Sequence, residues 1–184
     1  TMAAVHERML SHARHDGVLV VVLYTLTRLA FSDLAYGAWS TAVARQTEAL
    51  ELGTATGQPI LAGAPQAALL LISALRGEDG FAERLAELQP VLDGPPAGVL
   101  DLLMRDLVRW AQAMRSFPRS EEGLHHLAQM NLDVLRRQAG LDRIEAAAHA
   151  GQRELAQLWI GDLDRFAAVT GEAWAAAIVA HGRA

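Results

Sequence analysis

The arginines of this sequence have the residue type and the spacing that suit anion binding. Arg105 and Arg109 lie one helical turn apart, and Asp101 precedes Arg105 by four residues. This spacing fits an ordinary surface ion pair, which contributes roughly 0.3–0.5 kcal/mol. The alternative is a grip for an anion or an acidic peptide on the inner wall of a helical array. The predicted residues for ligand or partner binding are Tyr24, Arg28, Arg105, Arg109 and Arg136.

The histidines lack the spacing of a metal site. His12 and His15 lie at i and i+3 with His6 nearby. A helical zinc protease motif instead places two histidines four residues apart around a glutamate. His125 and His126 are adjacent, so on a helix their side chains point about 100° apart. We therefore expect no metal ion.

Nucleophiles and general bases are equally sparse. The sequence has no cysteine, and all 16 basic residues are arginine. This excludes thiolate zinc sites, a cysteine nucleophile, a phosphate-binding loop with its lysine and a pyridoxal Schiff base. No serine lies in a Gly-x-Ser-x-Gly turn, and paired carboxylates such as Asp162 and Asp164 fit exposed helix faces. We expect no catalytic residue, no cofactor and no enzymatic activity.

The composition suits a helical protein with a sizeable core. Hydrophobic residues make up 52% of the chain and aromatic residues 5%, so leucine, alanine and valine must pack together closely. The net charge of −5 argues against a broad nucleic-acid-binding surface. The apolar stretches 18–23 and 61–75 are shorter than the roughly 20 residues of a membrane span. We expect a cytoplasmic protein that contacts neither nucleic acid nor a membrane directly.

Glycine and proline divide the chain into segments with helical periodicity. Between these breaks, apolar residues recur at intervals of three and four residues, which predicts helices. In the helix that ends at Thr170, the spacing predicts one apolar stripe of Leu155, Leu158, Trp159, Leu163, Phe166 and Val169. Pro65 predicts a kink or a late helix start, Ser120 is expected to cap a helix, and Asn131 is expected to replace glycine in a left-handed cap. The predicted helices cover 1–16, 17–36, 39–52, 59–76, 81–92, 99–114, 120–131, one helix from Arg137 to the turn at Gly151, a second from there to Thr170, and the start of another at 172–184.

The turn positions recur every 35 to 40 residues in two interleaved sets. This interval is close to the tetratricopeptide period of about 34 residues. We predict an all-α, tetratricopeptide-like, right-handed superhelix of about four helix–turn–helix repeats in a single domain, 1–184. The approximate repeats are 17–57, 58–94, 95–131 and 132–171, with a further repeat starting at 172–184. The two sets of turns are Gly57, Gly94, Asn131 and Gly171, and Gly37, Gly77, the Ser116 region and Gly151.

The last two helical segments resemble a known family. The stretches GLDRIEAAAHAGQRELAQ and AVTGEAWAAAIVAHGRA are similar to the final repeats of large ATP-binding regulators of the LuxR family, and the resemblance covers most of residues 17–184. The sequence departs from the family pattern at Leu141, where the family has proline, and at Arg153-Glu154, where it has a glutamate pair. The matching positions are Leu141, Asp142, Glu145, Ala146, Ala147, Ala150-Gly151, Thr170-Gly171, Trp174, Ala175 and Arg183-Ala184.

The resemblance implies a place in a larger protein. Members of the family carry an ATPase module, a central helical-repeat sensor and a helix-turn-helix DNA reader. This chain would contain only the sensor and would be a piece of a longer array, with the ATPase and DNA-binding domains elsewhere. It would bind a protein partner or a small-molecule effector along a concave face.

A second hypothesis is a free-standing tetratricopeptide-like scaffold for protein–protein interaction. It rests on the same repeat period without the family resemblance. A phosphate-binding loop encoded upstream and a helix-turn-helix encoded downstream would decide for the regulator.

Overall fold

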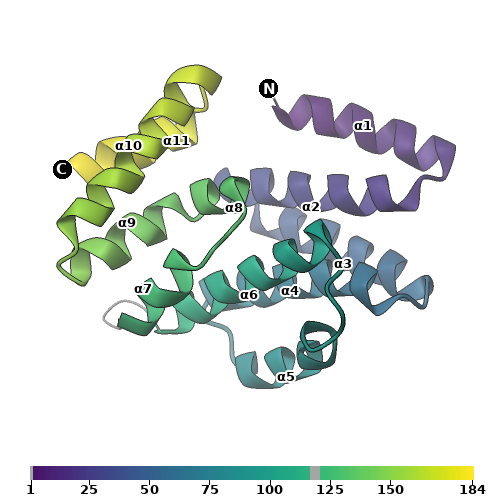
Figure 1. Ribbon diagram of the computed structural model, residues 1–184. Helices are drawn as coiled ribbons and strands as arrows, with labels where there is room; N and C mark the ends of the chain where they lie inside the picture. The colour runs from purple at the N-terminus through teal and green to yellow at the C-terminus, as the bar shows by residue number, and fades with distance from the viewer. Residues whose placement is uncertain (1, 117–120) are drawn as a thin grey trace. The chain divides into compact units, whose positions relative to one another are not determined.

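The computed structural model of the chain is all-α, as predicted (Figure 1). It describes residues 2–116 and 121–184. The predicted turn at Phe117-Pro118 and the predicted cap at Ser120 lie outside these residues. The described residues form the helices α1 (Met2–Asp16), α2 (Leu19–Ala35), α3 (Trp39–Ala55), α4 (Pro59–Leu75), α5 (Phe81–Leu92), α6 (Val99–Ser116), α7 (Glu121–Ala128), α8 (Asp133–Gln138), α9 (Gly140–His149), α10 (Arg153–Thr170) and α11 (Ala173–Arg183).

The turns after the first four helices share a left-handed glycine at a constant spacing. Each of these helices ends at a glycine with positive φ, a conformation that other residues adopt at a cost. After α2, the Ala38 N–H donates to the Asp33 carbonyl at 2.8 Å, which is the longer hydrogen bond of a Schellman motif. Each turn is therefore short, and the next helix runs back along the previous one. The glycines recur every 20 residues, at Gly17, Gly37, Gly57 and Gly77.

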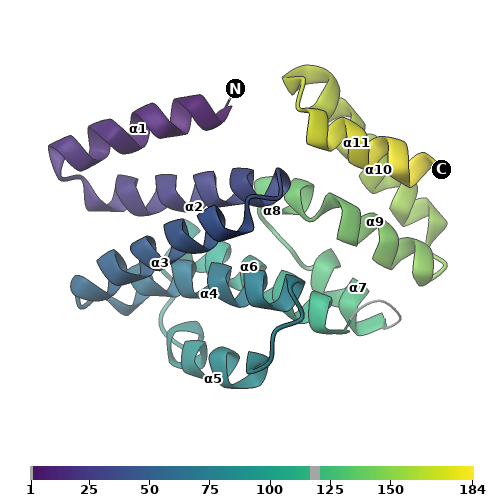
Figure 2. The same ribbon diagram turned by 180° about the vertical axis from the view of Figure 1, so that it is seen from behind.

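The contacts divide the chain into two compact units, Thr1–Val108 (unit 1) and Arg109–Ala184 (unit 2). The boundary falls inside α6. In unit 1, α1 packs against α2, α2 against α3, α3 against α4 and α4 against α5 (Figures 1 and 2). Leucine and alanine dominate the core that they enclose, as the composition predicts. A cluster of fully buried side chains contains Leu10, Leu23, Leu26, Leu29 and Ala49.

Helices α3 and α4 approach each other closely at a glycine and a proline. Pro65 lies inside α4 and has no N–H, so the Leu61 carbonyl loses its usual helical partner. A Cβ placed on Gly53 of α3 would lie 2.6 Å from that carbonyl oxygen, so glycine is needed for this contact. Helix α4 begins at Pro59, and the late start predicted from Pro65 is wrong.

Unit 2 is built around α9 and α10. Helix α10 packs against α9 and α11, and α9 also contacts α7, α8 and α11. A Cβ on Gly140 would lie 3.1 Å from Leu163 Cδ2, so a small residue at the start of α9 permits close packing on α10. The buried side chains of this core are Ile144, Ile160, Leu163, Ala175 and Val179.

The connection between α7 and α9 differs from the prediction. Asn131 does not form a left-handed cap, because α7 already ends at Ala128 and no described residue other than glycine has positive φ. The backbone is instead extended at Leu132, with φ −80° and ψ 117°. The single helix predicted from Arg137 is two helices, α8 and α9, with the break at Ala139. Glycine at position 140 weakens helix continuity and favours packing on α10.

Several large apolar residues that were expected to face inward are exposed. On α10, Leu158 is 63% exposed and Val169 is 86% exposed. The buried stripe of this helix is formed instead by Ala156, Ile160 and Leu163. The small alanine lets a neighbouring helix approach, and this turns the buried face away from the largest side chains.

Across residues 2–116 and 121–184, no helix is both long and apolar enough to cross a bilayer. Sequential antiparallel packing is consistent with a helical-repeat protein. The predicted single domain with its repeat boundaries stays a prediction.

Candidate functional site

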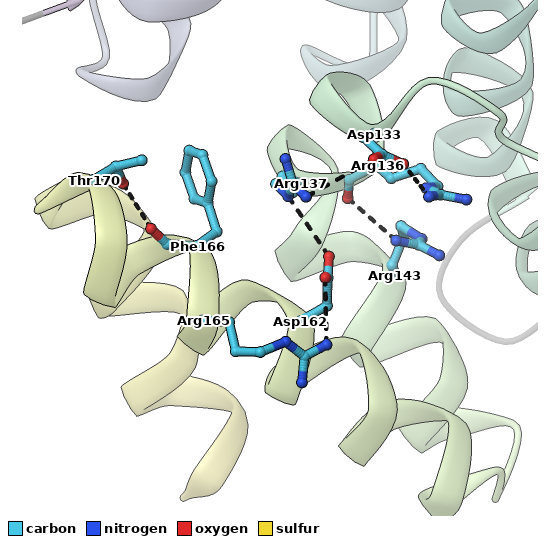
Figure 3. Close-up of polar contacts among 8 residues, drawn as sticks. All are labelled: Asp133, Arg136, Arg137, Arg143, Asp162, Arg165, Phe166 and Thr170. Atoms are coloured by element: carbon cyan, nitrogen blue, oxygen red, sulfur yellow. Dashed lines mark hydrogen bonds and ion pairs between the residues drawn. The ribbon is translucent and has the colours of Figure 1, made fainter.

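Six charged side chains gather where α8, α9 and α10 meet (Figure 3). Helix α8 contributes three of them, α9 one and α10 two. The short α8 and the turn at Ala139 bring the end of α8 and the start of α9 onto α10. We name this group the α8–α10 arginine cluster: Asp133, Arg136, Arg137, Arg143, Asp162 and Arg165.

Two aspartates pair with three of the four arginines in this cluster. Arg136 forms an ion pair with Asp133. Arg137 Nε lies 3.6 Å from Asp162 Oδ2, and Arg165 Nη2 lies 3.5 Å from Asp162 Oδ1. Four arginines thus face two aspartates, and the cluster keeps two positive charges in excess.

Arg143 is the fourth arginine, and it has no acidic partner. Its side chain is buried, with 7% of the residue exposed. Arg143 Nη1 donates to the Arg136 carbonyl at 3.4 Å, while Nε is buried without a hydrogen-bond partner. Among the described residues, no carboxylate lies within 4.0 Å of its guanidinium nitrogens.

Aromatic rings contact two of the four arginines of the cluster. The Arg143 guanidinium carbon lies 4.0 Å from the centre of the Trp159 ring, which is a cation–π contact. Arg137 lies 5.0 Å from the centre of the Phe166 ring, and Phe166 contacts Trp174 of α11 with 5.9 Å between ring centres. The guanidinium groups of Arg137 and Arg143 are therefore held in position by packing on aromatic rings.

The electrostatics of Arg143 reflect its burial. Burial, together with the neighbouring charge of Arg136, lowers the pKa of the Arg143 guanidinium to about 10, and Asp162 acts in the opposite direction. Arg143 stays protonated at neutral pH. A buried cation with unmet donors is unfavourable unless an acceptor reaches it. A ligand oxyanion supplies such an acceptor, because a guanidinium donates two parallel hydrogen bonds to a carboxylate or phosphate.

A second arginine without an acidic partner, Arg28, lies between α1 and α2. Tyr24 and Arg28, both predicted as binding residues, lie here beside His6. The His6 and Tyr24 rings are 6.5 Å apart, edge to face. His6 Nδ1 and Arg28 Nε are buried without hydrogen-bond partners, and no described carboxylate forms an ion pair with Arg28. Burial and the charge of Arg28 lower the pKa of His6, and burial lowers the pKa of Arg28 itself.

The other predicted residues of α6 have structural contacts. Arg105 Nε donates to Asp101 Oδ2 at 2.9 Å, and Arg105 Nη2 donates to the Leu92 carbonyl at 2.6 Å. Arg105 therefore connects the start of α6 to the end of α5, which matches the ion-pair alternative. Arg109 lies on the part of α6 in unit 2, where its charge helps lower the pKa of His126.

The structure thus brings together some predicted residues and adds others. Tyr24 and Arg28 are neighbours in unit 1, and Arg136 belongs to the α8–α10 arginine cluster. Two further residues, the buried His6 beside Arg28 and the buried Arg143, were not predicted from the sequence. Arg136 and Arg143 are on separate helices, α8 and α9, so no helical spacing in the sequence indicates that they are neighbours.

No group of three or more histidine, aspartate and glutamate side chains in the described ranges has metal-binding geometry. His12 and His149 each hydrogen-bond to a backbone carbonyl four residues earlier, at 2.8 Å. These two histidines are engaged with their own helices.

No family model, curated protein or solved structure matches the chain. Its function is therefore inferred from the geometry of its own side chains. The α8–α10 arginine cluster is the better defined of the two candidate places, because two of its arginines pack on aromatic rings and its arginines outnumber its carboxylates.

Proposed function

We propose that the chain is a non-catalytic helical-repeat module that binds an effector carrying an oxyanion at the α8–α10 arginine cluster. The observation that carries this proposal is Arg143, which is buried, stacked on Trp159 and without a carboxylate partner. Arg136 lies beside it and is partly exposed. Together the two guanidinium groups offer a fixed set of donors to one anion.

A tetratricopeptide-like superhelix would suit this function. Arrays of helical hairpins present extended surfaces for ligands and partners, and the packing of neighbouring helices in sequence supports such an array. The resemblance to LuxR-type ATP-binding regulators supplies a context in which an effector-bound sensor shifts the conformation of a longer protein. The ATPase and DNA-binding domains would then lie elsewhere in that protein.

The second candidate function is a tetratricopeptide-like scaffold that binds a protein partner. The exposed Leu158 and Val169 favour it, because they are eleven residues apart on α10 and so lie on one face of that helix. An exposed apolar helix face is a surface that a protein partner can cover. An acidic segment of such a partner would contact the same arginines. The two candidates differ in whether a small anion alone is sufficient.

Calorimetric titration and thermal unfolding with inorganic phosphate and with citrate test the effector proposal. Sodium chloride at equal ionic strength serves as the reference, because salt screens charges without specific binding. We expect saturable binding, with stabilisation of about 2.7 kcal/mol at 100 times the dissociation constant. Arg143→Met should abolish this response and still fold, since replacing an unpaired buried charge with an apolar side chain is often neutral or stabilising.

The matched control is Arg153→Met at the exposed start of α10. It removes one positive charge outside the cluster and should leave anion binding unchanged. Equal losses in both variants would indicate a general charge effect and contradict the proposal. Absence of anion binding, with tight binding of a glutamate-rich peptide, would favour the scaffold.

A further inference from the structure

A groove runs along α4 between α3 and α5 in unit 1. Helix α4 contacts both neighbours and lies between them (Figure 2). The groove has a volume of about 350 Å³, which is within the usual range of roughly 300–1,000 Å³ for small-molecule sites. It contains none of the predicted binding residues, and it is separate from the α8–α10 arginine cluster.

The floor and walls of the groove are mainly aliphatic. Helix α4 supplies most of them, and α3 supplies one wall. Such a surface gains free energy when an apolar ligand displaces water from it. The aliphatic side chains are Val43, Leu50, Leu69, Leu70 and Ile72.

Gln66 and Ser73 are the uncharged polar side chains of the lining, and Ser73 is the one that is buried. Ser73 also lines the groove and is 1% exposed. Its hydroxyl oxygen has no hydrogen-bond partner, whereas the hydroxyl of Thr27, also within a helix, donates to the Leu23 carbonyl of the preceding turn at 3.0 Å. A buried hydroxyl without a partner is unfavourable, so a ligand oxygen that reaches Ser73 would satisfy it.

The charges around the groove cancel. Glu78 lies 3.1 Å from Arg76 and 3.3 Å from Arg84, and so links the two arginines. Glu87 on α5 adds a second carboxylate. The rim therefore carries two positive and two negative charges, whereas the α8–α10 arginine cluster keeps a positive excess. Charge complementarity favours a neutral ligand here.

We propose that this groove binds a neutral aliphatic molecule whose single hydrogen-bonding oxygen contacts the Ser73 hydroxyl. The aliphatic part of the ligand lies along Leu69 and Ile72, and its oxygen accepts the serine O–H. The balanced rim of Arg76, Glu78, Arg84 and Glu87 surrounds the site. This site provides the chain with a second binding specificity, distinct in charge from the oxyanion site.

The test is a titration of the full chain with 2-alkanones of six to ten carbons, followed by methyl NMR. We expect saturable shifts at the methyl groups of Val43, Leu50 and Ile72. Each added methylene should tighten binding about two- to fourfold until the groove is filled. Octanoate, which carries a negative charge, should bind less tightly than 2-octanone.

Ser73→Ala separates the hydrogen bond from the apolar contact. It should weaken 2-octanone binding about fivefold without lowering the melting temperature, because it removes a hydroxyl that has no partner. Ser11→Ala, at an exposed position of α1, is the matched control and should change neither quantity. Leu69→Gln, which makes the floor polar at nearly constant size, should also weaken binding.

Other results would overturn the proposal. Unsaturable shifts spread over methyl groups of both units would indicate nonspecific partitioning. Octanoate binding more tightly than 2-octanone would contradict a neutral ligand, and unchanged affinity in Ser73→Ala would remove the serine from the site. Arg143→Met should leave 2-octanone binding unaltered, so failure here is distinct from failure of the oxyanion proposal.

Discussion

Asp142 on α9 shows how burial changes the behaviour of a single carboxylate. Its Oδ2 accepts a hydrogen bond of 2.7 Å from the Trp110 indole N–H of α6. Burial raises the pKa of Asp142 to about 6, while the bond from Trp110 acts in the opposite direction and Glu145 adds to the increase. Folding therefore favours the protonated form of this residue, which keeps its proton to a higher pH than in the unfolded chain.

The first prediction concerns the pH dependence of stability at Asp142. Because the folded-state pKa is raised, the stability of the wild type should fall as pH rises from about 4 to about 6. Asp142→Asn removes this cost and still accepts the Trp110 N–H. The raised pKa of Asp142 corresponds to a gain in unfolding free energy of at most about 3 kcal/mol in the variant. Loss of the negative charge at the start of α9 reduces this gain by up to about 1 kcal/mol. Thermal unfolding should show a higher melting temperature for the variant at pH 7.5 and almost no difference at pH 4.

Asp164→Asn provides the comparison for this prediction. Asp164 lies on α10, is half exposed and pairs with Arg183 at 2.7 Å. An exposed pair contributes roughly 0–1 kcal/mol, so its removal should lower stability slightly at pH 7.5. A melting temperature of Asp142→Asn at or below that of wild type at pH 7.5 would contradict the assignment.

For single residues, the sequence predicts which residue types carry charge better than it predicts which residues pair with them. Arginine is the chemically informative side chain, and Arg136 does lie in a positively charged cluster, whereas Arg28 lies beside His6 and Tyr24 as a single cation. Whether an arginine has an acidic partner depends on tertiary packing. Arg105 has its predicted partner Asp101 four residues earlier, whereas the isolation of Arg143 follows from the way α9 lies on α10. Spacing along the chain therefore predicts the pair of Arg105 with Asp101, but it does not predict that Arg143 lacks an acidic partner.

Single contacts of this kind depend on how closely two helices approach. Between α3 and α4, Gly53 lies against the carbonyl that Pro65 leaves without a helical partner. The second prediction is that Gly53→Ala destabilises the protein by about 2 kcal/mol or more, because the added Cβ meets backbone atoms that cannot move aside. Urea unfolding followed by circular dichroism measures this change.

Gly161→Ala on α10 is the helical control. A Cβ there meets only the end of the Arg165 side chain, at 3.8 Å. Alanine should therefore stabilise by about 0.5–1 kcal/mol through helix propensity. Destabilisation of similar size in both variants would show that the close contact at Leu61 is not the cause.

The turn between α3 and α4 gives the third prediction. Gly57 has φ +68°, and no atom lies within 4 Å of a Cβ built on it. Gly57→Ala should therefore cost only the backbone strain, about 1–2 kcal/mol. Gly57→Asn should cost less, because asparagine adopts this conformation more readily. Equal melting temperatures for glycine, alanine and asparagine at this position would contradict a left-handed turn.

Helix ends were more predictable than helix faces. Turns at Gly37, Gly57, Gly77 and Gly171 were located because left-handed caps require glycine. The buried stripe of α10 was assigned to its largest side chains, although Ala156 is buried and Leu158 is exposed. Alanine does not mark a buried helix face in a sequence pattern, yet its small side chain decides where two helices can pack closely. The break between α8 and α9 depends on the packing of Gly140 on Leu163, which no local pattern reveals.

Across the whole molecule, most helices pack against their neighbours in sequence. In such a chain, stability is approximately a sum of local terms and nearest-neighbour terms. Two compact units, Thr1–Val108 and Arg109–Ala184, have their own buried cores, around Leu26 and Leu163.

The fourth prediction follows from this organisation. Gly53→Ala weakens the α3–α4 contact, so hydrogen exchange should accelerate in α2, α3 and α4, which pack on one another. Exchange in α10 and α11 should stay at the wild-type rate. Mass spectrometry of peptic fragments measures both regions in one experiment. Gly161→Ala serves as the reference, because it should slow hydrogen exchange in α10. Uniform acceleration along the whole chain would mean that the two cores unfold as one cooperative unit, and the additive description would then fail.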